Sequence, residues 1–231
     1  MPGFDNIDYN AGLVLSLPFT EELGAAAVFH DQSKIGHQLL AGSAIVKSTP
    51  AASDLPVIDF DQAVPDFLYA LGADTPDLDW NTSDFSLSAW IRVESFTGDV
   101  MIMARGLAVT DGWQFYVETT GRLHIVTSQN LADQDTYSAL GSIALATWYH
   151  VGATRDGAVC QVLIDAVDVT EVADTHVHPT VNAARNFYVG VYNGVSSGFD
   201  GMMWKPQAWS KKLVVPNWMN MRQVERHWFG S

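Results

Sequence analysis

Alternation of apolar and polar side chains with a period of two residues marks much of this chain as β-structure. The clearest example is the segment 84–93, DFSLSAWIRV. One predicted face carries Phe85, Leu87, Ala89 and Ile91, and the other carries Ser86, Ser88, Trp90 and Arg92. Because successive side chains of a strand point to opposite faces, this pattern predicts a strand with its apolar face on a core.

The segment 147–169, TWYHVGATRDGAVCQVLIDAVDV, predicts three antiparallel strands in close succession. Apolar positions alternate on both sides of Asp156-Gly157, and a second reversal follows at Asp165-Ala166. Asp-Gly is a strong hairpin signal, because glycine adopts positive φ readily and aspartate tolerates it better than most residues. The segment is therefore predicted to form part of an antiparallel sheet and to contain no helix.

Apolar runs predict the remaining elements. Further strands are expected at 11–19, 57–61, 101–104, 113–118, 122–127, 187–192 and 202–209. The acid-rich segments 62–82 and 130–136 are expected to be loops. Pro216 at a helix start and Gly230 past its end predict a short C-terminal helix at about 216–229. We divide the chain into an N-terminal arm, 1–10, and one domain, 11–231.

The order of these motifs resembles that of laminin-G-like domains in the concanavalin A-like lectin/glucanase superfamily. In that family a Trp-His pair, a valine-rich strand, an Arg-Asp-Gly turn and a Val-Asp-Gly turn follow one another. The matching residues here are Trp148, His150, Val151, Arg155, Asp156, Gly157 and Asp165. Ala166 stands where the family usually has glycine. The resemblance implies an all-β, two-sheet antiparallel jelly-roll sandwich with a short C-terminal helix.

The charge composition limits the classes of molecule that the chain is expected to bind. The formal net charge is −14, from 26 acidic and 12 basic residues, and the basic residues are scattered. This balance argues against nucleic acid and anionic membranes as partners. Cys160 is the single cysteine, so no intrachain disulfide is possible, and its strand position predicts a buried apolar role. Residues 1–19 lack the basic region of a secretory signal, and no apolar run approaches membrane-spanning length.

Catalysis is not expected. The superfamily includes glucanases, whose Glu-x-Asp-x-x-Glu pattern would place two carboxylates on one face of a strand. That pattern is absent here. The nearest approach is Asp59 and Asp61, with Val57 where the first glutamate should stand, so we interpret both aspartates as strand-end or turn residues. The chain is predicted not to be an enzyme.

Glycan binding needs aromatic platforms and hydrogen-bonding groups close to loops. The candidates are Trp80, Trp113, Tyr137, Tyr192 and Asn193. The alternative is that such aromatics fill the core of the sandwich, and the sequence does not separate the two uses.

Cation binding has two candidate clusters. The resemblance implies a structural calcium between the loop after the first strand and the closing strand, held by Asp31, Ser33 and Asp200, although Met203-Trp204 replaces an expected Ile-Asp pair. The loop acids Asp74, Asp77 and Asp79 form the other cluster. His176 and His178 lack further zinc ligands at suitable spacing, and His150 is expected to be structural.

Three classes of function remain open. The first is a non-enzymatic surface module, a structural, decoration or adhesion component of a virus particle such as a bacteriophage, with a lectin-like fold. The second is a carbohydrate-binding domain of a bacterial surface protein, and the third is a glycoside hydrolase. For the first class the expected partners are copies of the chain, capsid or tail proteins and host-surface glycans. Its expected location is the virion surface, against an extracellular or bacterial cell-surface location for the second.

Overall fold

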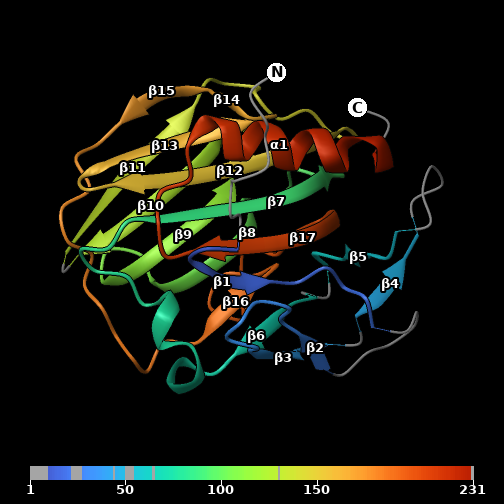
Figure 1. The fold of residues 1–231 in the computed structure, drawn as a ribbon, viewed down its shortest axis with the longest axis horizontal. Helices are drawn as coiled ribbons and strands as arrows, with labels where there is room; N and C mark the ends of the chain where they lie inside the picture. The colour runs from blue at the N-terminus through green and yellow to red at the C-terminus, as the bar shows by residue number, and fades with distance from the viewer. Residues whose placement is uncertain are drawn as a thin grey trace.

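The computed structural model describes residues 10–21, 28–43, 45–49, 55–63, 66–129 and 131–229. Apart from Asn10, the predicted N-terminal arm lies outside these residues. The described strands form two stacked antiparallel sheets, which confirms the predicted jelly-roll sandwich (Figure 1). No helix in the described part of the chain is both long and apolar enough to cross a membrane.

Sheet A has eight strands. From one edge to the other they are β14 (Val167–Asp168), β13 (Val159–Ile164), β12 (Trp148–Asp156), β7 (Phe85–Val93), β17 (Gly201–Trp209), β5 (Val57–Phe60) and β4 (Val46–Ser48), with β1 (Leu13–Ser16) also paired to β17. The predicted hairpin of segment 147–169 forms one side of this sheet. The strand predicted at 84–93 lies in the middle.

Sheet B has nine strands. Their order is β15 (Thr170–Ala173), β11 (Ala132–Ser138), β10 (Leu123–Gln129), β9 (Asp111–Val117), β8 (Val100–Leu107), β16 (Phe187–Val189), β6 (Leu68–Ala70), β3 (Gln38–Ala41) and β2 (Val28–His30). Consecutive strands β8 to β11 form a meander, and β16 joins this meander to the N-terminal strands.

One acidic segment was wrongly predicted as a loop, and the loop prediction for a second was correct only in part. Residues 132–136 belong to strand β11, which pairs with β10 and β15. Its acids Asp133 and Asp135 lie on the outward face. The inward positions hold polar side chains, Gln134, Thr136 and Ser138, so the apolar alternation that marks a strand is missing. Segment 62–82 contains β6 and two 3₁₀ turns, Gly72–Asp74 and Pro76–Leu78.

Both predicted turns of the hairpin region are present. Gly157 has φ +58 and connects β12 to β13, with Asp156 opposite Val159. Asp165 (φ 52) and Ala166 (φ 67) connect β13 to β14 and are both left-handed, as in a type I′ turn. Ala166 therefore adopts the conformation in which the family usually places glycine.

The C-terminal helix explains why strand β7 is buried on both faces. α1 (Val215–Glu225) and the 3₁₀ turn Arg226–Trp228 lie across sheet A over β7 and β12 (Figure 1). The predicted apolar face of β7 points into the sandwich core, and its other face meets the helix segment: Ser86 Oγ accepts a 2.8 Å hydrogen bond from Leu213 N. Trp90 stacks on Phe229, with 4.4 Å between ring centroids. The helix thus covers a second, smaller apolar layer.

Candidate binding face

The two predicted tryptophan platforms are core residues. Trp80 is 4% exposed and Trp113 is 0% exposed. Trp80 stacks between Phe85 and Trp113, with centroid distances of 4.6 and 5.1 Å. Trp113 Nε1 donates a 2.8 Å hydrogen bond to Leu78 O. These rings hold the two sheets together, and neither offers a face to a ligand.

The other three glycan candidates lie on the outward face of sheet B. Tyr137 is a half-buried residue of β11. Tyr192 and Asn193, both half-buried, belong to the loop after β16. The structure therefore separates the five candidates by burial, which the sequence could not do.

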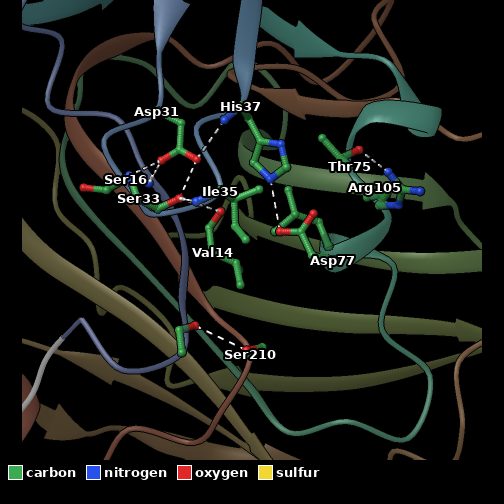
Figure 2. Close-up of polar contacts among 12 residues, drawn as sticks. Val14, Ser16, Asp31, Ser33, Ile35, His37, Thr75, Asp77, Arg105 and Ser210 are labelled. Atoms are coloured by element: carbon green, nitrogen blue, oxygen red, sulfur yellow. Dashed lines mark hydrogen bonds and ion pairs between the residues drawn. The ribbon is translucent and has the colours of Figure 1, made fainter.

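The predicted calcium ligands do not converge. Asp31 Oδ1 accepts 2.7 Å hydrogen bonds from Ser16 N and Ser33 N, and Oδ2 accepts from Ser33 Oγ (2.6 Å) and His37 N (3.1 Å) (Figure 2). Donors rather than oxygen ligands surround this carboxylate, which ties the turn after β2 to strand β1.

Asp200 lies far from that turn. Ser16, which binds Asp31, pairs with Gln207 near the end of β17, whereas Asp200 precedes the start of β17. Seven residues of strand at about 3.3 Å each separate the two positions by roughly 20 Å. Among the described residues, no three His, Cys, Asp or Glu side chains lie close enough together to hold a metal ion.

The loop acids of segment 62–82 fix the loop to the sandwich. Asp77 Oδ2 lies 3.0 Å from His37 Nε2 (Figure 2). Burial alone would lower the pKa of His37, but the hydrogen bond and charge of Asp77 help to raise it overall. Asp79 Oδ2 lies 3.5 Å from the buried guanidinium of Arg105.

His176 has a structural role. It is fully buried, and its ring nitrogens lie 2.8 Å from Thr127 Oγ1 and Thr136 Oγ1. Burial lowers the pKa of His176 to about 4, so the ring is neutral. His178 is exposed and does not share this site.

A row of outward side chains crosses sheet B from strand to strand. Directly opposed pairs link Tyr69 to Tyr188, Tyr188 to Ala104, Ala104 to Gln114, Gln114 to Val126 and Val126 to Asp135. Adjacent strands lie about 4.8 Å apart, so two strand spacings, roughly 10 Å, separate Tyr188 from Gln114. Aromatic groups stand at one end of this row and carboxylates at the other.

The aromatic end is a cluster of three half-buried rings, which we call the aromatic patch. Phe67, Tyr69 and Tyr188 have centroid distances of 6.0 to 6.4 Å. Asn186 and Asn193 border the same hollow and supply amide groups. All three side chains are therefore partly exposed to solvent.

The acidic end is a hollow of about 290 Å³, which we call the acidic pocket. Its lining consists of Asp99, Met101, Ala108, Gln114, Tyr116, Val126, Asp133, Asp135, Tyr192 and Ser197. Tyr192 is fixed in the wall because its hydroxyl accepts a 2.7 Å hydrogen bond from Ala108 N. Burial raises the pKa of Tyr116, and the charges of Asp135, Asp99, Glu118 and Asp133 raise it further. The pocket is thus strongly electronegative.

A stacked ladder supports the floor of the acidic pocket. The His124 ring lies between Tyr116 and Tyr137, with centroid distances of 4.8 and 4.9 Å. His124 Nδ1 lies 3.1 Å from both oxygens of Asp135. The guanidinium of Arg122 covers the Tyr137 ring at 5.1 Å. Tyr137 therefore belongs to the support of the pocket rather than to its wall.

Sequence reasoning missed most of this face. Gln114, Tyr116, Tyr69 and Tyr188 were not singled out, although alternation along the predicted strand 113–118 would have placed Gln114 and Tyr116 on one side. What no alternation could show is which strands become neighbours, since Tyr69 and Tyr188 are far apart in the chain.

The predicted non-catalytic aspartates lie in the other sheet. Asp59 is on β5 of sheet A, where burial raises its pKa and the charges of Glu94, Asp200 and Asp61 raise it further against the opposing effect of Arg92. Asp61 Oδ1 accepts a 2.8 Å hydrogen bond from Ala63 N. Asp61 thus stabilises a turn at the end of the strand.

The two antiparallel sheets form a lectin-like jelly-roll fold. The outward face of sheet B carries both aromatic and acidic side chains. Residues 70–216, more than half of the chain, match the laminin G family model described as the Concanavalin A-like lectin/glucanases superfamily. The chain belongs to this superfamily, and the resemblance identified in its sequence is confirmed. No curated protein matches the chain in sequence.

Solved structures with the same fold include toxin binding domains. The botulinum neurotoxin serotype G binding domain superposes with a TM-score of 0.69 at 11% identity, covering 92% of this chain and 51% of that one. The binding domain of Paraclostridial Mosquitocidal Protein 1 gives 0.67 at 14% identity, covering 91% and 51%. That of botulinum neurotoxin DC, solved with rat synaptotagmin II, gives 0.62 at 12%, covering 93% and 52%. This chain therefore spans about half the length of these proteins, and the likeness shows the fold alone.

Proposed function

We propose that this chain is a non-enzymatic module on the outer surface of a virus particle such as a bacteriophage, and that it binds glycans through the outward face of sheet B. The observation that carries the glycan proposal is the cross-strand row from Tyr69 and Tyr188 to Gln114 and Asp135. The row combines ring faces and hydrogen-bonding groups within a few strand spacings.

The chemistry of this row suits a saccharide. A sugar ring has apolar C–H faces that pack on aromatic rings, and hydroxyl groups that hydrogen-bond to carboxylates and amides. The aromatic patch offers the first kind of surface, and the acidic pocket together with Asn186 and Asn193 offers the second. A short oligosaccharide laid across the strands reaches both.

The structural relatives support a binding role. They include the receptor binding domain of botulinum neurotoxin type G, and the binding domain of botulinum neurotoxin DC is seen in complex with rat synaptotagmin II. The same fold thus presents recognition surfaces in other proteins, although a fold by itself does not assign a function. For this chain the assignment rests on its own outward groups.

A binding module without catalysis agrees with the placement of the carboxylates. The glucanase pattern is absent from the sequence. In the acidic pocket Asp135 contacts His124, and Asp133 Oδ1 accepts hydrogen bonds from Val109 N and Ser128 Oγ at 2.7 and 2.6 Å. These contacts orient the two aspartates and leave Oδ2 of Asp133 without a donor from the described residues, which suits hydrogen bonding to a ligand.

The virion setting is supported by the cysteine chemistry. Cys160 is the only cysteine and is buried as a free thiol. The sandwich is therefore stabilised without disulfides, as expected of a protein that folds in a reducing cytoplasm and leaves the cell by lysis. Purification from the native source tests this setting: the chain should travel with particles, and recovery with the bacterial envelope instead would favour the cell-surface alternative.

Glycan binding is tested with an oligosaccharide array followed by calorimetry on the best ligand. Replacing Tyr69 and Tyr188 together by alanine should weaken binding by about 5-fold to 150-fold, because each stacked ring contributes roughly 0.5–1.5 kcal/mol. Trp228→Ala is the matched control, since Trp228 is 37% exposed but lies beside α1 on the other sheet. Absence of glycan binding, or equal binding by the double variant, would reject the proposal.

A further inference from the structure

We infer that the acidic pocket selects an amino sugar, a saccharide residue carrying a protonated primary amine, in preference to neutral or anionic sugars. The inference rests on the proposed glycan binding and adds the class of sugar. The juxtaposition that carries it is a buried, unpartnered amide of Gln114 in a pocket lined by Asp99, Asp133 and Asp135.

The charge of the pocket is unbalanced. Its lining contains three carboxylates and no lysine or arginine. Of these three carboxylates, only Asp135 has an ion-pair partner among the described residues, His124 at 3.1 Å. Arg122 is turned onto the Tyr137 ring and lies 4.0 Å from Glu171. Since like charges repel at short range, an anionic sugar is disfavoured here and a cation is attracted.

The carboxylates keep unused acceptors. Oδ1 of Asp133 accepts from Val109 N and Ser128 Oγ, but no described group donates to its Oδ2. Asp99 Oδ1 accepts only a long 3.4 Å contact from Thr119 N. An ammonium group has three donors and no acceptor, so it matches such a set of free carboxylate oxygens.

The side chain of Gln114 places a second, independent requirement on the ligand. It is 7% exposed, lines the pocket, and its Nε2 has no hydrogen-bond partner in the described chain. A buried donor without an acceptor is unfavourable, and a ligand oxygen would satisfy it. The ligand should therefore offer an oxygen acceptor next to its ammonium group. An amino sugar carries hydroxyl oxygens beside the amine, whereas an alkylamine such as a lysine side chain has none.

The test compares three tetrasaccharide probes by calorimetry at pH 6: a glucosamine tetramer, its N-acetylated neutral counterpart, and a tetramer of galacturonic acid. The glucosamine tetramer should bind about tenfold more tightly than the neutral probe, and the anionic probe should bind most weakly. The preference should shrink as salt rises, because screening weakens attraction between charges near the surface.

Amino-acid substitutions in the acidic pocket test which carboxylates cause the preference for the glucosamine tetramer. Asp99→Asn combined with Asp133→Asn should abolish the preference for glucosamine while leaving binding of the neutral probe, because asparagine at 133 still accepts from Val109 N and Ser128 Oγ. Asp99→Asn alone leaves the Asp133 contacts intact. It should reduce the preference for glucosamine by less than the double variant does. Asp156→Asn, at an exposed residue paired with Lys212, is the control for net charge and should change nothing.

The outcomes separate the two proposals. Equal binding of the amine and neutral probes, or a preference that survives in the double variant, overturns the amino-sugar inference while glycan binding stands. Failure of all three probes and of the array overturns both.

Discussion

The indole Nε1 of Trp90 donates a 2.8 Å hydrogen bond to Oε2 of Glu225, joining the middle strand of sheet A to the last turn of α1. The other oxygen of Glu225 contacts Lys205 Nζ on β17. Glu225 is only 6% exposed, so this carboxylate is held in the interface by one neutral and one charged donor. The contact fixes the position of the helix on the sheet.

Replacing Glu225 by alanine should therefore destabilise the protein by about 2–4 kcal/mol, because the buried indole N–H and the ammonium group of Lys205 both lose their acceptor. Glu225→Gln should cost less, since the amide oxygen still accepts from Trp90. Urea unfolding measures both. Glu171→Ala is the control: its side chain is 51% exposed and 4.0 Å from Arg122, so a change below about 0.5 kcal/mol is expected. Equal losses at the two glutamates would contradict a specific buried contact.

The buried histidines His150 and His176 should make stability fall in mild acid. Burial lowers the pKa of both His150 and His176 to about 4, whereas an unfolded histidine titrates near 6.5. Between these values the unfolded chain binds more protons than the folded one, so stability decreases as pH falls from 6.5 to 4. Each histidine contributes on the order of 3 kcal/mol to this decrease.

The His176→Gln variant isolates one of these contributions. Glutamine does not titrate, so the stability difference between the natural protein and this variant should shrink as pH is lowered through the window. Urea unfolding at pH 7, 6, 5 and 4 measures the difference. A difference that stays constant with pH would show that His176 binds its proton equally well in the folded and unfolded states.

Cys160 should be chemically inert in the folded protein. Its side chain is fully buried in β13, and burial raises the pKa of its thiol to about 12. Because only the thiolate reacts, a disulfide reagent at pH 8 should label the native protein slowly and at a rate set by unfolding. Labelling should become fast in denaturing urea. Rapid labelling of the native protein would place the thiol at the surface.

Gly152 should be intolerant of a side chain. A Cβ at this position would lie 2.5 Å from Cζ3 of Trp218 and 3.2 Å from Leu87 O. Gly152→Ala should therefore push Trp218 and helix α1 away from β12 and cost about 1–3 kcal/mol, measured by urea unfolding and tryptophan fluorescence. Gly98→Ala is the control, because its Cβ would meet only Gln62 Nε2 at 3.5 Å. Similar effects at both glycines would remove the packing explanation.

Local patterns in the sequence predicted a strand correctly where the strand's own residues show which face is buried. The alternation in 84–93 predicted β7 and the division of its faces, and the glycine turn predicted the β12–β13 hairpin. The short C-terminal helix was also expected. Strand β11 was missed, because Asp133 and Asp135 face solvent and no run of apolar residues accompanies them.

The candidate site was predicted only in part. Tyr192 and Asn193 were named from the sequence, but so were Trp80 and Trp113, which occupy the core. An aromatic residue near a loop carries no local mark that tells whether it points inward or outward. The unpartnered amide of Gln114 can be recognised only in the tertiary structure, since its neighbours come from β8, β10 and the loop after β16.

The class of fold and its turns could be predicted from the amino-acid sequence, because side-chain alternation and glycine conformations act over a few residues. Tertiary structure decided which outward groups meet. Residues Tyr69 and Tyr188 become neighbours through pairing of distant strands, and Glu225 reaches Trp90 only because α1 folds back over sheet A. Contacts of this kind depend on long-range packing, which no local pattern encodes.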